Sequence, residues 1–234
     1  MFTHTYETRY GDYKDFDTIK TGSVLDMIQD VAIKDSVRVG YGIHKLKEMN
    51  LAWLLQGINI EFSKPASTKA MVDVSTGVKT LKGATSVRCS VVSQNDEIIA
   101  KAVANWFLFN TEKNKIAPIV PEMISAYDYY DFDEECYIYK KLKIQEMDKV
   151  HYKIRISNQH IDTNKHLNNQ KGADILIDAL PFDFDIKRAN ILYKKPAYLG
   201  DELGVCIKET ETGYYVHIQN ESGEVCVAGT FDNK

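Results

Sequence analysis

Apolar residues recur at the spacing of an α-helix at two places in the chain. The apolar stripe at the first place consists of Val24, Ile28, Val31 and Ala32. The stripe at the second place consists of Ala173, Leu176, Ile177 and Leu180, and Pro181 follows it directly. Recurrence at every third or fourth position lines one side of a helix, and proline cannot continue one. The pattern predicts two helices, the first of them capped by Thr21 or Ser23.

Shorter runs that alternate between apolar and polar residues surround each predicted helix. In the first half they are expected at residues 5–9, 51–62, 72–78, 85–93 and 98–110. Turn signals such as Lys82-Gly83 separate them, and short turns of this kind join antiparallel neighbours. The first half therefore predicts an antiparallel sheet that curls around one helix, an α+β arrangement.

The second half repeats the first. Tyr6-Glu7-Thr8-Arg9 matches Tyr152-Lys153-Ile154-Arg155, and the eight residues from Asn59 match the eight from Asn190. We expect two tandem domains, 1-125 and 139-234, and a tyrosine- and acid-rich linker, 126-138, that packs on the sheet. Pairing the two sheets edge to edge would protect two exposed strand edges, so we expect that arrangement.

Composition adds little to this picture. The 234 residues are 44% hydrophobic and 26% charged, with a net charge of −4, as in ordinary globular proteins. The chain has no surplus of basic residues, which would indicate nucleic acid as a partner. It also has no apolar run of about 18 residues, which would indicate a membrane span. The scattered cysteines have no metal-ligand spacing, and no glycine-rich phosphate loop is present. We expect a cytoplasmic protein with reduced thiols and no metal or cofactor; a homodimer stays open.

The densest chemistry lies between Ser157 and Asn169, where two histidines, an aspartate and four asparagines precede the second helix. Asp162, Asn164 and His166 alternate, and alternate side chains of an extended segment lie on one side. These three are the candidate catalytic residues. The structural alternative is an Asx turn for Asp162 and helix capping for Asn168 and Asn169.

A helix wrapped by an antiparallel sheet, with a polar turn before the helix, resembles the hotdog fold. Its duplication in one chain resembles the double-hotdog acyl-ACP thioesterases. The run Asp162–Asn169 is similar to their Asp-x-Asn-x-His-x-Asn-Asn signature, and the resemblance extends over Trp106–Pro121 and Gly22–Trp53. It implies an enzyme of fatty acid biosynthesis that hydrolyses fatty acyl thioesters, most of all acyl-ACP, to free fatty acid and carrier, with acyl carrier protein as partner.

The resemblance suggests a role for each residue of the signature. A neutral His166 can activate water or hold the thioester. Asn164 can orient the carbonyl or the histidine, and Asp162 can orient Asn164 or act on water. Backbone N–H groups near Asn168 and Asn169 can stabilise an oxyanion, although capping is the more ordinary role of these two side chains.

The first copy of the turn lacks this chemistry. Its run Asp17-Thr18-Ile19-Lys20-Thr21 has isoleucine and threonine where the second copy has Asn164 and His166. We therefore expect a single active site in the second half. The first half is expected to be a degenerate copy that shapes an apolar acyl tunnel and sets specificity, with Met27, Ile28 and Trp53 binding substrate.

One departure from the family concerns the carboxylate. Plant members carry Tyr-Arg-Arg-Glu-Cys where this chain has Tyr193-Lys194-Lys195-Pro196-Ala197. Pro196 thus replaces the family glutamate, and Asp201 or Glu202, both expected in a turn, are the candidate substitutes. A non-catalytic acyl-binding hotdog protein, an acyl-CoA thioesterase and a hydroxyacyl dehydratase stay open as alternatives.

Overall fold

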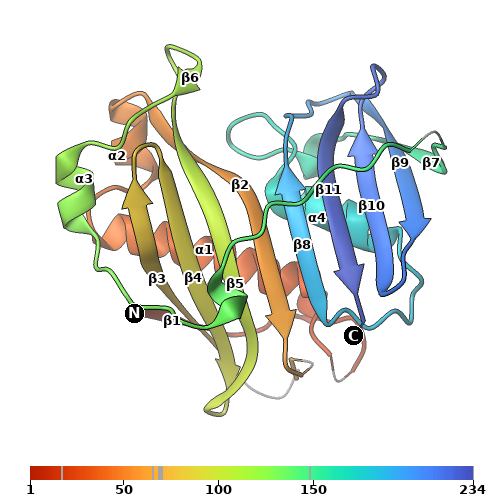
Figure 1. Ribbon diagram of the computed structural model, residues 1–234, viewed down its shortest axis with the longest axis horizontal. Helices are drawn as coiled ribbons and strands as arrows, with labels where there is room; N and C mark the ends of the chain where they lie inside the picture. Colours follow the sequence, from red (N-terminus) through yellow and green to blue (C-terminus); the bar gives the residue numbers. More distant parts are fainter. Residues whose placement is uncertain (17, 65, 68–70, 148, 234) are drawn as a thin grey trace. The chain divides into compact units, whose positions relative to one another are not determined.

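The computed structural model describes residues 1–16, 18–64, 66–67, 71–147 and 149–233. Asp17 and Pro65, which belong to the repeated segments, lie outside the described residues. The chain divides into two compact units, Met1–Tyr139 and Lys140–Lys234. Each unit combines one antiparallel sheet with a helix on one of its faces (Figure 1).

The strands of the first unit are β1 (Phe2–Tyr6), β2 (Leu51–Phe62), β3 (Val72–Lys82), β4 (Thr85–Gln94), β5 (Glu97–Asn110) and β6 (Lys115–Ile116). Its helices are α1 (Thr21–Arg38), α2 (Ile43–Glu48) and α3 (Pro121–Ala126), with 3₁₀ turns at Tyr10–Asp12 and Glu135–Tyr137. The sheet order is β1-β3-β4-β5-β2, all antiparallel, and β6 pairs with β5.

The second unit repeats this order. Its elements are β7 (Tyr152–Arg155), a 3₁₀ turn (Asn158–His160), α4 (Asn169–Asp178), β8 (Arg188–Tyr193), β9 (Glu202–Glu209), β10 (Gly213–Gln219) and β11 (Val225–Asp232). Its antiparallel sheet runs β7-β9-β10-β11-β8, element for element the order of the first unit. The predicted α+β fold, with one sheet packed on a helix in each copy, is confirmed.

Several boundaries in the first unit differ from expectation; β3, expected at 72–78, continues to Lys82. Strand β1 ends at Tyr6, because the Asp12 carboxylate accepts a hydrogen bond from the Arg9 N–H (2.7 Å) and turns the chain there. Helix α1 has Lys20 at its N-cap and no side-chain cap, so the prediction of a Thr21 or Ser23 cap is wrong. The chain is held at that point by backbone instead: the N–H of buried Ile19 donates to the Ala66 carbonyl (2.9 Å).

The sheet face opposite the helix is covered in each unit by the segment between the sheets. In the first unit, residues expected to form the linker bury Phe132 and Tyr137 against Cys89 and Val103. In the second unit, Leu142, Ile144 and Met147 pack against a cluster of Tyr215, Val225 and Ala228. Helix and connecting segment thus enclose each sheet from its two sides (Figure 1).

A buried histidine lies under the segment that covers the second sheet. His217 is 1% exposed, and its ring nitrogens lie 3.3 Å from the Tyr215 hydroxyl and 3.2 Å from Gln219 Oε1. Its neighbour across the strand pair is the buried thiol of Cys206. Burial lowers the pKa of His217 below its ordinary value, because a charged imidazole loses hydration there.

We expect the stability of the second unit to depend on His217 in mild acid. Below about pH 6.5 the unfolded chain binds a proton that the folded chain resists, so the free energy of unfolding falls as the pH falls. Urea denaturation from pH 7.5 to 5 should show a shallower loss for His217→Gln than for wild type. The control is His44→Gln, at an exposed position on α2, which should lose stability with the same slope as wild type. Equal slopes for His217→Gln and wild type would contradict the assignment.

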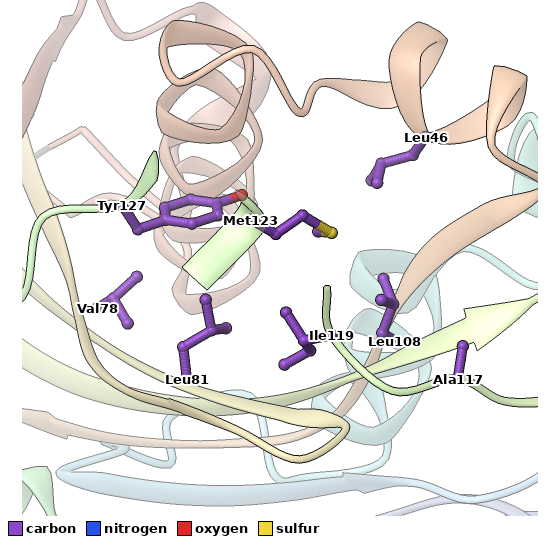
Figure 2. Close-up of a cluster of buried hydrophobic side chains, with 8 residues drawn as sticks. All are labelled: Leu46, Val78, Leu81, Leu108, Ala117, Ile119, Met123 and Tyr127. Atoms are coloured by element: carbon purple, nitrogen blue, oxygen red, sulfur yellow. The ribbon is translucent and has the colours of Figure 1, made fainter. Parts of the chain in front are cut away.

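A buried ion pair joins α1 to the first sheet. Arg88 Nη1 lies 2.7 Å from Asp35 Oδ2, and both side chains are nearly inaccessible (6% and 4% exposed). The Arg88 guanidinium also stacks on the ring of Tyr127 (5.4 Å). Figure 2 shows Tyr127 in an apolar cluster with Leu46, Val78, Leu81, Leu108, Ala117, Ile119 and Met123.

Removing one partner of this pair should destabilise the first unit. Asp35→Leu leaves the Arg88 guanidinium buried without its carboxylate, and such a loss costs about 3–5 kcal/mol. The double variant Asp35→Leu/Arg88→Met should recover most of that loss, since no buried charge is left. Chemical denaturation measures both. Glu48→Ala, which removes an exposed partner of Lys45, is the control; a loss for Asp35→Leu no larger than for Glu48→Ala would refute the prediction.

Candidate active site

Asp162 organises the turn that precedes α4. Its Oδ1 accepts hydrogen bonds from the backbone N–H groups of Asn164 (2.8 Å) and His166 (3.2 Å). The Asp162 N–H in turn donates to the His166 carbonyl (2.9 Å), which closes the loop. Lys165 has a φ of +64°, so the chain bends sharply here. One carboxylate thus fixes the backbone of both other candidate residues.

The prediction of an extended segment is therefore wrong, and the Asp162 carboxylate contacts the backbone of Asn164 and His166 rather than their side chains. A tight loop, rather than strand alternation, joins Asp162, Asn164 and His166, because the Asp162 carboxylate offers the backbone an alternative to a strand. Asn164 is exposed at the tip of the loop. The Asx-turn alternative for Asp162 describes its observed contacts.

His166 is half-buried and contacts an aromatic side chain that the sequence did not single out. Its ring meets the ring of Tyr198 edge to face, with centroids 5.2 Å apart and planes at 74°. Within the described residues, neither ring nitrogen of His166 has a hydrogen bond to protein. His160, by contrast, accepts from the Ser157 N–H through Nδ1 (3.0 Å) and serves the turn before the loop. Of these two imidazoles, that of His166 is thus the one without a hydrogen bond to the described protein.

The first turn of α4 lies directly after the loop. Asn168 is the N-cap, and its Oδ1 accepts from the Lys171 N–H (3.2 Å), as its capping role predicts. The N–H groups of Asn169 and Gln170 belong to the first turn, where helical N–H groups lack intrahelical partners. Together with the helix dipole they favour a developing negative charge near His166.

The segment that replaces the family carboxylate lies against the loop. The Ala197 carbonyl accepts from the Leu167 N–H (2.8 Å). Asp201 Oδ2 accepts from the Tyr198 N–H (2.8 Å), so this acid orients the residue that contacts His166. Glu202 begins strand β9 rather than lying in a turn, and pairs with Lys153 (2.5 Å). Both candidate acids have partners other than His166 in the described residues.

The residues expected to bind the acyl chain lie in the first unit. Met27 and Ile28 are buried on α1 (6% and 3% exposed). Trp53, on β2, packs against the cluster of Figure 2. Ile19, which stands where the second copy has Asn164, is buried (4% exposed), whereas Asn164 is exposed. The first copy of the turn therefore presents an apolar side chain to the interior instead of an amide to solvent.

Both halves of the chain match family models. Residues 1–127 match the acyl-ACP thioesterase N-terminal domain, and residues 141–232 match the acyl-ACP thioesterase C-terminal domain. The chain belongs to the acyl-ACP thioesterase family. The predicted enzyme class, a hydrolase that acts on thioester bonds, and the hotdog fold are confirmed. Comparison with curated protein sequences gave no match.

Solved structures show the same fold, two of them over nearly the whole chain and one over about half of it. An acyl-ACP thioesterase from Bacteroides thetaiotaomicron superposes with a TM-score of 0.89 at 23% identity, covering 99% of this chain and 96% of that one. The 12:0-ACP thioesterase from Umbellularia californica gives 0.86 at 15% identity, with 99% and 96% covered. A gentisyl-coenzyme A thioesterase covers 54% of this chain with all of its own length (TM-score 0.50, 12% identity).

Three further features describe this acyl-ACP thioesterase. Among the described residues, no group of three or more His, Cys, Asp or Glu side chains is arranged to hold a metal ion. Every helix in the described part of the chain is too short or too polar to span a membrane. All four cysteines are free thiols.

The cap of α4 can be tested by stability. Asn168→Ala removes the oxygen that accepts from the Lys171 N–H and should cost about 1 kcal/mol in the free energy of unfolding. Asn168→Ser keeps an acceptor at the N-cap and should recover most of the loss. Urea denaturation followed by circular dichroism measures both variants. A loss for Asn168→Ser as large as for Asn168→Ala would contradict the cap.

Proposed function

We propose that the second unit hydrolyses a fatty acyl thioester on acyl carrier protein at the loop Asp162–His166, and releases free fatty acid and the carrier thiol. The observation that supports this site is the ordering of the loop by a single carboxylate. Asp162 holds the backbone of Asn164 and His166, and the His166 ring is left uncommitted beside a helix N-terminus. Membership of the family supplies the reaction class.

The chemistry then proceeds in two steps. A neutral His166 imidazole removes a proton from water while the water oxygen bonds to the thioester carbonyl carbon. The negative charge that develops on the carbonyl oxygen is stabilised by the N–H groups of Asn169 and Gln170, at about 3 kcal/mol for one such donor. The carbon–sulfur bond breaks, and the imidazolium returns its proton to the departing sulfur. Water, thioester, acid and thiol balance without a cofactor.

Asp162 and Asn164 have different parts in this proposal. The Asp162 carboxylate accepts hydrogen bonds from two backbone N–H groups, which supports an orienting role rather than the activation of water. The exposed Asn164 amide is available at the tip of the loop to hydrogen-bond the thioester carbonyl. Asn168 acts through the helix by capping it.

The two copies divide the work. We infer that the first copy, 1-125, shapes an apolar acyl tunnel with Met27, Ile28 and Trp53, and that the second copy, 139-234, carries the chemistry. The burial of Met27 and Ile28 and the loss of the amide at Ile19 support this division. The free thiols are consistent with the cytoplasmic site of action that we propose.

An acyl-binding protein without turnover is the second candidate. It is favoured by Pro196 in place of the family glutamate and by the commitment of Asp201 and Glu202 to other partners. The two candidates differ in thiol release, because a binder retains the acyl thioester intact.

His166→Ala should lower the rate of thiol release from acyl-ACP by about 10²–10⁴-fold, the usual contribution of a general acid–base group. Acyl-ACP and acyl-CoA of several chain lengths are the substrates, and free thiol is measured. His44→Ala, on the exposed side of α2, should leave the rate unchanged. Full activity in His166→Ala would overturn the site, and saturable binding without thiol release by wild type would establish the binder instead.

A further inference from the structure

Four side-chain polar atoms in the described residues are buried without a hydrogen-bond partner: Trp106 Nε1, Tyr139 Oη, Asn190 Oδ1 and Tyr193 Oη. Folded proteins leave few buried polar groups unpaired, so each such group raises the question of what it meets in the working protein. The amide of Asn190 still donates to the Lys140 carbonyl (3.0 Å), and Tyr139 packs with the outer apolar cluster of the first unit. Tyr193 differs from Asn190 and Tyr139 because it lies on the side of the second sheet that α4 covers.

Tyr193 lies on the face of the second sheet that carries α4. Along β8, Asn190 and Leu192 lie on the opposite face of the sheet, which the connecting segment covers. Its register partner on β11 is Val227, and a Cβ on Gly172 of α4 would lie 3.2 Å from the Val227 side chain. The Tyr193 ring therefore belongs to the same side of the sheet as the first turns of α4, where the candidate site begins.

The surroundings determine what kind of atom this hydroxyl can bind. Burial raises the pKa of Tyr193 well above its usual value, and the Asp174 carboxylate on α4 adds to the effect. The phenol is therefore neutral and presents a proton. A neutral donor that lacks a protein acceptor suits a ligand that brings one, and carbonyl oxygens are the acceptors of an acyl thioester and its carrier arm.

A ligand can reach the Tyr193 hydroxyl only if neighbouring side chains move. Tyr193 as a residue is partly exposed, whereas its hydroxyl oxygen is buried. Asp174, on the helix beside it, keeps 32% of its side chain exposed, and Lys171 keeps 40%. Partly exposed side chains such as that of Lys171 change rotamer within nanoseconds.

We propose that Tyr193 is a further substrate-binding residue, whose hydroxyl donates a hydrogen bond to a carbonyl oxygen of the substrate. That oxygen belongs either to the thioester or to an amide in the thiol-bearing arm of the carrier. This inference rests on the proposed thioesterase function and adds to it a group from β8, the strand that leads into Pro196.

The experiment compares Tyr193→Phe with Tyr139→Phe. Both remove one buried, unpaired hydroxyl and keep the ring, so both should leave the melting temperature unchanged or raise it. With the acyl-ACP that wild type hydrolyses fastest, Tyr193→Phe should lose at least tenfold in kcat/KM, while Tyr139→Phe should stay within twofold. Phenylalanine at position 193 with wild-type kcat/KM overturns the proposal. So does a melting temperature that falls more for Tyr193→Phe than for Tyr139→Phe, since the hydroxyl would then be structural.

A second substrate separates the two sources of the carbonyl. The acyl thioester of 2-mercaptoethanol has a thioester carbonyl and no amide. If the loss in Tyr193→Phe persists with it, the hydroxyl binds the thioester carbonyl; if the loss disappears, the hydroxyl binds an amide of the carrier arm. Wild type without turnover on any thioester would remove the proposed function and this inference together, whereas active wild type with an equally active Tyr193→Phe removes this inference alone.

Discussion

Each sheet of this protein has to bury both of its faces, and most of the architecture follows from that constraint. Helix α1 packs on one face of the first sheet and α4 on one face of the second, and the segment between the sheets covers the other face in each unit. Glycine lets the covering segment approach the strands closely. A Cβ on Gly77 of β3 would lie 2.5 Å from the Tyr130 ring, and one on Gly204 of β9 would lie 3.0 Å from Val150. The same solution occurs at corresponding strands of both copies, as expected for a duplicated fold.

The candidate site lies where one of these covers begins. A helix that must pack on a sheet needs a fixed point of entry, and each copy fixes it differently. In the first copy buried Ile19 and its backbone hydrogen bond hold the chain. In the second copy a carboxylate holds it from the solvent side, which leaves the imidazole of His166 and the amide of Asn164 without structural duties. The proposed chemistry and the start of α4 thus involve the same few residues.

Periodicity was sufficient to predict α1, α4 and the main strands of the first half, because these depend on burial summed over many positions, and matching segments of sequence revealed the repeat. Local hydrogen bonding decided what periodicity missed. The Asp162 loop replaced the expected extended segment, and backbone contacts at Ile19 replaced the expected side-chain cap. The sequence did not single out Tyr198 or Tyr193, because the ring contact of Tyr198 with His166 and the unpaired hydroxyl of Tyr193 exist only in the folded chain, and spacing along the sequence carries no signal for them.

The outer cover also determines where the chain can be divided. Phe132 and Tyr137 complete the apolar layer over Cys89 and Val103, so they belong to the first unit although they follow its last strand. A first half cut at residue 125 would expose that layer to water and present a bare sheet face, a surface prone to self-association. A first half that keeps its chain through Tyr139 would carry its own cover with it.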